Sequence, residues 1–316
     1  MHSSRNARPI SPASHGDPSM TERASNAARW IAAARPKTLF LAASPVIAGI
    51  GMAIIETQGV AIVTAILTLL AALALQIGTN LYNDAGDFER GTDTAERLGP
   101  QRATAQGWFS PAQVKGAAHL MFGITFAMGI ALVLRGGWPI LAVGVASLFA
   151  GYAYTGGRRP IAYGPLGEAY VLVFFGVIAV WGSYYLQTLS FGWSPIMAGM
   201  ALGLPAAAVL LLNNYRDLET DRAAGRRTLC HYLGRPNARW LYLFMLVAPI
   251  PILMSLPELS LPWLLLIPLP AAVVLGRRLF RGTQGVALNA LLAQTALYQL
   301  GLTVLFLLGL ALSQIL

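Results

Sequence analysis

Long uncharged hydrophobic stretches, separated by short polar segments, dominate the chain. They cover residues 38–55, 57–83, 116–134, 136–157, 169–215, 240–257, 259–276 and 282–316. Because a helix needs about 20 mostly apolar residues to cross a bilayer, each stretch predicts a transmembrane helix. The stretch 169–215 is too long for one helix, and the turn-forming segment at 190–195 divides it into two. The pattern therefore predicts an all-α, polytopic membrane bundle of nine transmembrane helices.

The remaining segments are polar, and they divide the chain into an N-terminal tail and one membrane domain. Residues 1–28 are rich in Ser, Pro, Arg and Asn without an apolar core, which predicts a disordered N-terminal tail. Residues 29–316 then form one membrane domain, whose longest polar loops are 83–111 and 216–238. Six prolines between residues 249 and 270 predict kinks in the seventh and eighth helices.

Composition supports a membrane protein and excludes other classes. The chain is 56% hydrophobic and 11% charged, whereas about a quarter of the residues of a soluble domain are charged. An ordinary cytosolic enzyme is therefore excluded. The single cysteine, Cys230, excludes a disulfide framework or a cysteine metal cluster.

Basic residues fix the predicted orientation. With the N-terminus in the cytoplasm, 21 of the 22 Lys and Arg residues fall on the cytoplasmic side, and only Arg135 falls on the other. This satisfies the positive-inside rule and predicts a cytoplasmic N-terminus and an external C-terminus. The net charge of +9 is thereby explained without a nucleic-acid partner.

Acidic residues are scarce and concentrated on the same side. Eight of the thirteen lie in two short segments, which are Asp84, Asp87, Glu89, Asp93 and Glu96 in the first and Asp217, Glu219 and Asp221 in the second.

Within each segment the spacing predicts one helical stripe, formed by Asn80, Asp84 and Asp87 and by Asn214, Asp217 and Asp221. Oxygen ligands of this kind suit Mg²⁺, which commonly shares substrate phosphates. Two facing stripes favour a metal–diphosphate site over a pair of solvated loops.

Basic residues beside these segments are candidates for binding a diphosphate. Arg158 and Arg159 follow two glycines at 156–157, and an Arg fork matches phosphate oxygens. Plain membrane anchoring explains them equally well. The same two interpretations apply to Arg35, Lys37, Arg226 and Arg227, and the segment 99–102, which ends at Arg102, could cover the site.

Polar and aromatic residues within the predicted spans have two interpretations. Trp181, Tyr184, Tyr185, Gln294 and Tyr298 could line an apolar tunnel and stabilise a carbocation. More often such residues pack the bundle or anchor it at the interface.

The two aspartate motifs resemble those of a known family. The runs NLYNDAGD at 80–87 and NNYRDLETD at 213–221 are similar to the two aspartate-rich motifs of the UbiA superfamily of intramembrane prenyltransferases. Within it, the chain resembles the MenA type, the 1,4-dihydroxy-2-naphthoate polyprenyltransferases. Four segments carry this likeness: RPKTL at 35–39, GTD at 91–93 with RLGPQR at 97–102, GPLGE at 164–168, and DR at 221–222 with RTL at 227–229.

The resemblance implies both an activity and site residues. It implies a nine-helix inner-membrane enzyme with a cytoplasm-facing site, which transfers a polyprenyl group from polyprenyl diphosphate to 1,4-dihydroxy-2-naphthoate. It implies Mg²⁺–diphosphate binding by Asp84, Asp87, Asp217 and Asp221, assisted by Asn80 and Asn214, with Arg158 or the adjacent Arg159 contacting the diphosphate. Lys37 is a further diphosphate-binding candidate because of its position just before the first span.

Other functions stay open. Another acceptor, such as 4-hydroxybenzoate, is the nearest alternative. A CDP-alcohol phosphotransferase would need a different aspartate pattern, and a cation transporter would favour acids at mid-membrane. The oligomeric state, the prenyl chain length and the roles of Asp93, Glu168 and Arg102 are not predicted.

Overall fold

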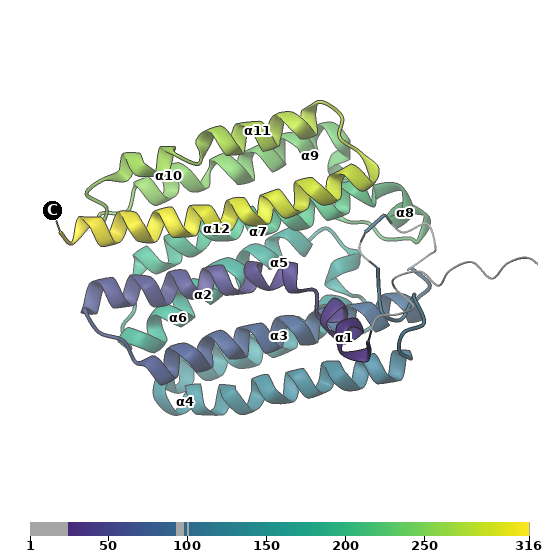
Figure 1. The fold of residues 1–316 in the computed structure, drawn as a ribbon, viewed down its shortest axis with the longest axis horizontal. Coiled ribbons are helices and arrows are strands. Elements are labelled where there is room, and N and C mark those ends of the chain that lie inside the picture. Colours follow the sequence, from purple (N-terminus) through teal and green to yellow (C-terminus); the bar gives the residue numbers. More distant parts are fainter. Residues whose placement is uncertain (1–24, 93–97, 100, 316) are drawn as a thin grey trace, which may run out of the picture.

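The protein forms a bundle in which the long helices run roughly side by side in one common direction (Figure 1). The computed structural model describes residues 25–92, 98–99 and 101–315, and these form helices and no strands. The helices near the N-terminal half are α1 (Asn26–Ala34), α2 (Pro36–Thr57), α3 (Ile62–Glu89), α4 (Pro111–Thr155), η1 (Ile161–Tyr163), α5 (Gly167–Leu172), η2 (Val173–Ile178) and α6 (Ala179–Thr188). They are followed by α7 (Trp193–Arg216), α8 (Leu218–Ala223), α9 (Leu229–Val247), α10 (Pro249–Met254), η3 (Pro262–Leu266), α11 (Leu269–Phe280), η4 (Gly285–Ala287) and α12 (Leu288–Ser313).

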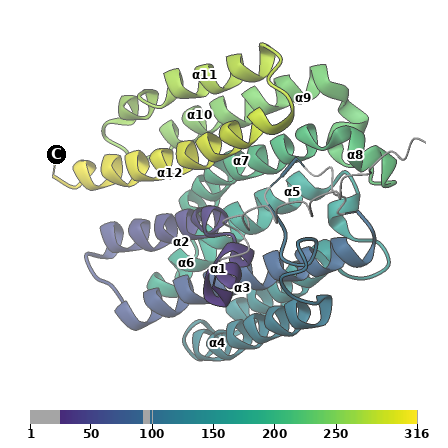
Figure 2. The same ribbon diagram turned by 45° about the vertical axis from the view of Figure 1, so that its right-hand side comes forward.

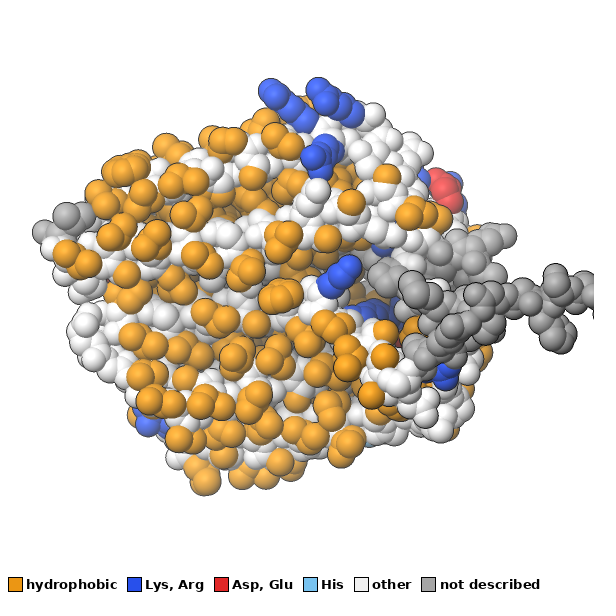
Figure 3. All heavy atoms as spheres, in the orientation of Figure 1, with side chains coloured by type: hydrophobic (Ala, Val, Ile, Leu, Met, Phe, Trp, Pro, Cys, Tyr) orange, Lys and Arg blue, Asp and Glu red, His pale blue; other side chains and the backbone are white. Residues whose placement is uncertain are grey.

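The described residues contain eight helical segments that are long and apolar enough to cross a membrane. Hydrophobic side chains cover the middle of the surface, as Figure 3 shows, and most basic side chains in that view lie toward one end. A surface of this kind suits a lipid environment. The protein is a multi-pass membrane protein.

One of the eight segments, α4, doubles back on itself. Its 45 residues would span about 68 Å if straight, and Gly137, at φ 66° and ψ −153°, breaks it near the middle. Glu89 at the end of α3 contacts Lys115 in the first half of α4, while the next residue, Arg90, donates to the Thr155 carbonyl at the end of the second half (2.6 Å). The two halves lie side by side (Figures 1 and 2). The nine crossings and the cytoplasmic N-terminus remain predictions.

The helices are interrupted at the turn-forming segment and at the prolines that the sequence pattern indicated. Helix α6 ends at Thr188 and α7 begins at Trp193, so the long stretch 169–215 is divided as predicted. Prolines begin α10 and η3, so the seventh and eighth spans are interrupted as expected. Residues 25–28, which were included in the predicted tail, instead begin α1, where Ser25 accepts a hydrogen bond from the Ala28 backbone amide and caps the helix. The remainder of the predicted tail lies outside the described residues.

Glycines let the central helices approach each other closely. Gly199 and Gly203 on α7 face Gly176 on η2, and a Cβ at Gly203 would lie 2.9 Å from the Gly176 Cα and 2.8 Å from the Leu172 carbonyl oxygen. Small residues four apart pack helices in this way inside membranes. Helix α7 is consequently the most enclosed span, with 67% of its most apolar window buried, against 11% for α4.

We expect Gly203→Ala to destabilise the protein, because the new methyl group meets backbone atoms that cannot move independently. Overpacking of this kind typically costs about 1–3 kcal/mol. Gly123→Ala on α4 is the matched control, since nothing beyond its own stretch of helix lies within 4 Å of its added Cβ. Thermal unfolding of both variants in detergent tests this; equal apparent Tm values would contradict the packing argument.

Candidate active site

The first aspartate motif lies on the last turns of α3. The helix continues to Glu89, which confirms that Asn80, Asp84 and Asp87 share a helix extended beyond the apolar run. All three side chains are buried, and Asp84 and Asp87 are each 1% exposed. Their environments differ, however. Asn80 and Asp87 line a cavity, whereas Asp84 does not.

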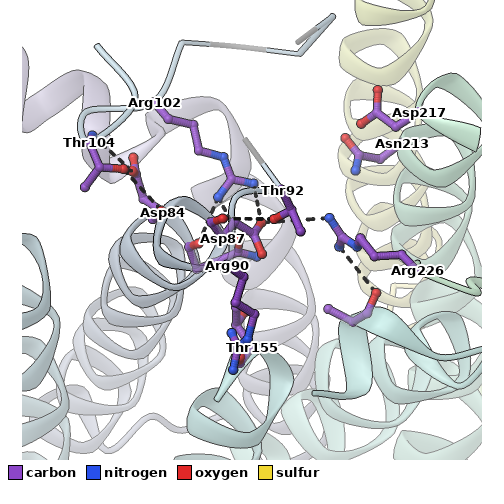
Figure 4. A network of polar contacts seen from close by, with 12 residues as sticks. Asp84, Asp87, Arg90, Thr92, Arg102, Thr104, Thr155, Asn213, Asp217 and Arg226 are labelled. Carbon is purple, nitrogen blue, oxygen red and sulfur yellow. Dashed lines mark hydrogen bonds and ion pairs between the residues drawn. The ribbon is translucent and has the colours of Figure 1, made fainter. Parts of the chain in front are cut away.

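Helix geometry explains this difference. At about 100° per residue, Asp87 is rotated by only about 20° from Asn80, whereas Asp84 is rotated about 40° to the other side. Asp84 therefore faces the segment after α3. There it accepts hydrogen bonds from the backbone amides of Ala103 (2.9 Å) and Thr104 (3.2 Å), and from the Thr104 hydroxyl. Asp84 and Thr104 lie together on one side of Figure 4.

The second motif lies where α7 ends and α8 begins. Arg216 donates to the carboxylate of Asp217 (2.7 and 2.8 Å), and also to Asn213 and to Asn289 on α12, at 2.7 Å each. Asn214 donates to Glu168 at 2.9 Å. Asp217 and Asn214 line the cavity, and Asp221 is buried beside it on α8.

Two arginines lie beside the carboxylates of Asp87 and Asp221, and one of them, Arg226, connects the two motifs. Arg102 lies 2.8 Å from Asp87, and both side chains are almost completely buried. Arg226 lies between the motifs, with one Nη atom 4.0 Å from Asp87 and 3.4 Å from Asp221. Figure 4 shows the two arginines reaching toward Asp87 from opposite sides. The carboxylates of the two motifs therefore share positive charge from loop residues.

The charges of this cluster affect one another. Burial raises the pKa of Asp221 to about 6, although the neighbouring Arg226 acts to lower it. Burial acts to lower the pKa of Arg226, but Asp221 and Asp87 outweigh burial and raise it. Tyr163 donates a hydrogen bond to Asp87 at 3.0 Å and lies under the Arg226 guanidinium, 4.5 Å from ring centroid to Cζ. Asp87 is thus held by two cations and a phenol.

The cavity itself has a volume of about 470 Å³ and is polar at one end and apolar at the other. Its polar lining comes from both motifs and from basic residues of several elements. These polar residues include Lys37, Asn80, Asp87, Arg102, Asn214, Asp217 and Arg226. Aliphatic and aromatic side chains line the remainder, including Val46, Leu75, Tyr154, Tyr170, Phe174, Phe175 and Leu210. An amphiphile with an anionic head matches this division.

The basic residues predicted to bind a diphosphate differ in whether they line the cavity. Lys37 lines the cavity, whereas Arg158 and Arg159 are exposed and are absent from the lining. Arg90, which sequence patterns did not single out, holds the connection before them by donating to the Thr155 and Gly157 carbonyls. Asp93 and Glu96 lie outside the described residues.

The aromatic and amide residues predicted either to line a tunnel or to pack the bundle do not line this cavity. Trp181 stacks on Tyr185, with ring centroids 5.3 Å apart, and Tyr184 donates to Glu56. Tyr298 donates to the Leu246 carbonyl, and Gln294 accepts from Arg278. These contacts agree with the packing interpretation. Tyr163, Arg216 and Asn289 were missed. Arg216 lies within the second aspartate motif, directly before Asp217, and its position there was the available signal, whereas no nearby motif links Tyr163 or Asn289 to a carboxylate.

The donor set suits a hard cation, but the carboxylates are not gathered around one point. Among the described residues, no three Asp, Glu, His or Cys side chains are arranged to hold a metal ion. Oxygen atoms from Asp87, Asp217 and Asp221 nonetheless face one region from two helix ends, which is the ligand chemistry that Mg²⁺ prefers. Arginines supply the compensating charge in this structure.

An all-helical membrane bundle whose cavity is charged at one end and apolar at the other is typical of intramembrane proteins that bind amphiphiles. The sequence model of the UbiA prenyltransferase family matches residues 42–300. The chain belongs to this family.

Relatives and solved structures agree with the assignment. The 1,4-dihydroxy-2-naphthoate octaprenyltransferase of Escherichia coli (strain K12) is 37% identical over 306 residues, covering 93% of this chain and 99% of that protein. The enzyme of the same name from Mycobacterium tuberculosis is 37% identical and covers 75% of this chain and 80% of its own length. A UbiA homologue from Archaeoglobus fulgidus, solved with GPP and Mg²⁺, shares the fold at a TM-score of 0.68 and 15% identity, covering 90% of this chain and 99% of that one.

Arg226 should stabilise the ligand-free site because it offsets two buried carboxylates. We expect Arg226→Gln to lower the free energy of unfolding by about 3 kcal/mol, since breaking a buried ion pair leaves uncompensated charge. The adjacent Arg227 is exposed, so Arg227→Gln should change it by less than about 0.5 kcal/mol. Thermal unfolding in detergent with a chelator present measures both, and similar shifts for the two variants would refute this role.

Proposed function

We propose that this protein transfers a polyprenyl group from polyprenyl diphosphate to 1,4-dihydroxy-2-naphthoate, with release of diphosphate and CO₂, to give demethylmenaquinol, the reduced form of demethylmenaquinone. The observation that carries the proposal is the cavity of about 470 Å³, which joins an Asp- and Arg-lined end to an apolar interior. Two relatives at 37% identity, one of them matched over nearly its whole length, are named for this reaction. Polyprenyl diphosphate has the same amphiphilic division as the cavity.

The diphosphate belongs at the charged end, together with Mg²⁺. Asp87, Asp217 and Asp221 would hold the metal, and the side-chain oxygens of Asn80 and Asn214 lie on the same two helix ends. When bound, Mg²⁺ would neutralise charge on the departing diphosphate. Asp84 was predicted as a fourth ligand, but its carboxylate already binds residues 103–104.

Basic residues at this end supply the further charge that a diphosphate requires. Arg102 and Arg226 are close to the carboxylates, and Lys37 lines the same cavity. An Arg fork can donate two parallel hydrogen bonds to phosphate oxygens. Arg158 and Arg159 remain proposed diphosphate contacts, from their exposed position after Gly157.

The chain's own residues account for the remaining chemistry. Charge stabilisation at the diphosphate favours cleavage of the bond between its oxygen and the allylic carbon. The apolar wall, with Phe174 and Phe175, excludes water that would otherwise capture the allylic cation. The electron-rich ring carbon bearing the carboxylate then forms the new carbon–carbon bond, and the carboxylate leaves as CO₂. The aromatic faces of Tyr154 and Tyr170 border the same space and favour a nearby cation.

We place the site on the cytoplasmic side of the inner membrane. The support is the distribution of basic residues, of which 21 of 22 fall on the side that carries both aspartate motifs. Arg135, the exception, donates to the Leu186 and Gln187 carbonyls at the end of α6, away from the motifs. A water-soluble aromatic acid would reach the site from that side.

Purified protein supplied with Mg²⁺, polyprenyl diphosphate and 1,4-dihydroxy-2-naphthoate should release demethylmenaquinol, which mass spectrometry detects as such or, after oxidation in air, as demethylmenaquinone. We expect Asp217→Asn to reduce the rate by at least about a hundredfold, because a group that stabilises the departing charge is lost. Glu219→Gln, two residues on, is the matched control, since the Glu219 side chain is 70% exposed. It should retain activity.

The same assay separates the acceptors. 4-Hydroxybenzoate replaces 1,4-dihydroxy-2-naphthoate in a parallel reaction, and prenylation of 4-hydroxybenzoate alone would assign the protein to that alternative. Full activity of Asp217→Asn would refute the metal–diphosphate site.

A further inference from the structure

The segment after α3 is built around one buried carboxylate. Asp84 accepts from the amides of Ala103 and Thr104, one on each carboxylate oxygen, and from the hydroxyl of Thr104. The same hydroxyl also lies 3.2 Å from the Asp84 carbonyl. Hydrogen bonds to an ionised acceptor are among the stronger ones in proteins. Both oxygens of Asp84 are therefore committed to this segment.

The bound segment is a compact turn. The backbone amide of Gln106 donates to the Arg102 carbonyl (2.9 Å), and the backbone amide of Trp108 donates to the Ala103 carbonyl (2.9 Å). Ala103 is fully buried against Leu81 and Ala85 of α3. Backbone hydrogen bonds and packing thus fix the turn internally, and Asp84 fixes it to the helix.

Arg102, directly before the two amides, projects from this turn toward the cavity. Its guanidinium donates to the backbone and side-chain oxygens of Asn83, at 2.9 and 2.8 Å, and lies 2.8 Å from Asp87. Asn83 and Asp87 line the cavity, as Arg102 itself does. Arg102, the cation beside Asp87, is therefore adjacent in the chain to Ala103, whose backbone amide Asp84 holds.

From this juxtaposition we propose that Asp84 is a positioning residue, which places Arg102 in the diphosphate end of the cavity, and is not a metal ligand. The proposal rests on the proposed function, because it assigns Arg102 to the diphosphate of that reaction. Asp84 acts on the reaction through Arg102. Asp87, Asp217 and Asp221 are left as the carboxylates available to a cation.

Kinetics of single and double variants test this role. Asp84→Asn loses a carboxylate oxygen and presents an amide NH₂ to a backbone donor, so Arg102 is released. We expect a rise in KM for polyprenyl diphosphate of roughly ten- to a hundredfold, the range for lost hydrogen bonds to charged groups. The Mg²⁺ concentration for half-maximal rate should stay at the wild-type value. In an Arg102→Gln background, Asp84→Asn should add no further loss, as expected for residues that act as one unit.

Thr104→Val provides a second, milder variant if Asp84→Asn does not fold. It removes one donor to Asp84 without touching the cavity and should raise the same KM by a smaller factor. An Asp84→Asn protein that needs much more Mg²⁺, as a metal ligand would, overturns the proposal. A full additional loss in the Arg102→Gln background overturns it equally.

Hydrogen–deuterium exchange separates a failure of this proposal from a failure of the proposed function. In the ligand-free protein, Asp84→Asn should speed exchange of the Ala103 and Thr104 amides, and Glu219→Gln should not. This measurement needs no turnover. Unchanged protection of these amides refutes the anchoring role, whereas absence of prenyl transfer in the wild type refutes only the proposed reaction.

Discussion

Compensation of buried negative charge is the constraint on which this site depends. Asp84, Asp87 and Asp221 are at most 7% exposed. Asp84 and Asp87 lie at the end of α3, whose middle is apolar, and Asp221 lies on the short helix α8 that follows the span α7. Carboxylates removed from water require cations or hydrogen-bond donors close by. The protein meets the requirement with Arg102, Arg226, Tyr163 and two backbone amides. Most of the polar structure at this end of the bundle follows from that need.

The compensating groups come from connections, whereas the carboxylates come from helices or helix ends. Arg102 follows α3 and Arg226 follows α8, so each loop is tied to the helix end that it covers. The Arg227 amide donates to the Tyr163 carbonyl at 3.0 Å, which joins the two connections that flank Asp87. Because helices packed through Gly176, Gly199 and Gly203 hold the bundle closely, these connections meet over one cavity.

Much of this arrangement could be predicted from the sequence. The spans, the break at residues 135–137 and the extension of α3 past its apolar run follow from local hydrophobicity and spacing, which act within one element. The two aspartate motifs were found in the same way. Partners across elements could not be found, because no local pattern connects Tyr163 or Asn289 to a carboxylate far away in sequence. Arg158, between α4 and η1, and Arg226, between α8 and α9, both lie in short polar connections. Only the packing of these connections makes Arg158 exposed and lets Arg226 bridge two motifs.

Asp84 shows the limit of helical spacing most clearly. Asn80, Asp84 and Asp87 are spaced four and three residues apart, a spacing that places all three on one side of a helix. Asp84 and Asp87 nevertheless differ in direction by about 60° around α3. At the surface of a soluble helix that difference matters little, since water surrounds both side chains. Here the helix end is enclosed, with the cavity on one side and the 101–107 turn on the other. A rotation of 60° therefore decides whether a carboxylate faces the cavity or backbone amides, and two aspartates of one motif acquire different surroundings.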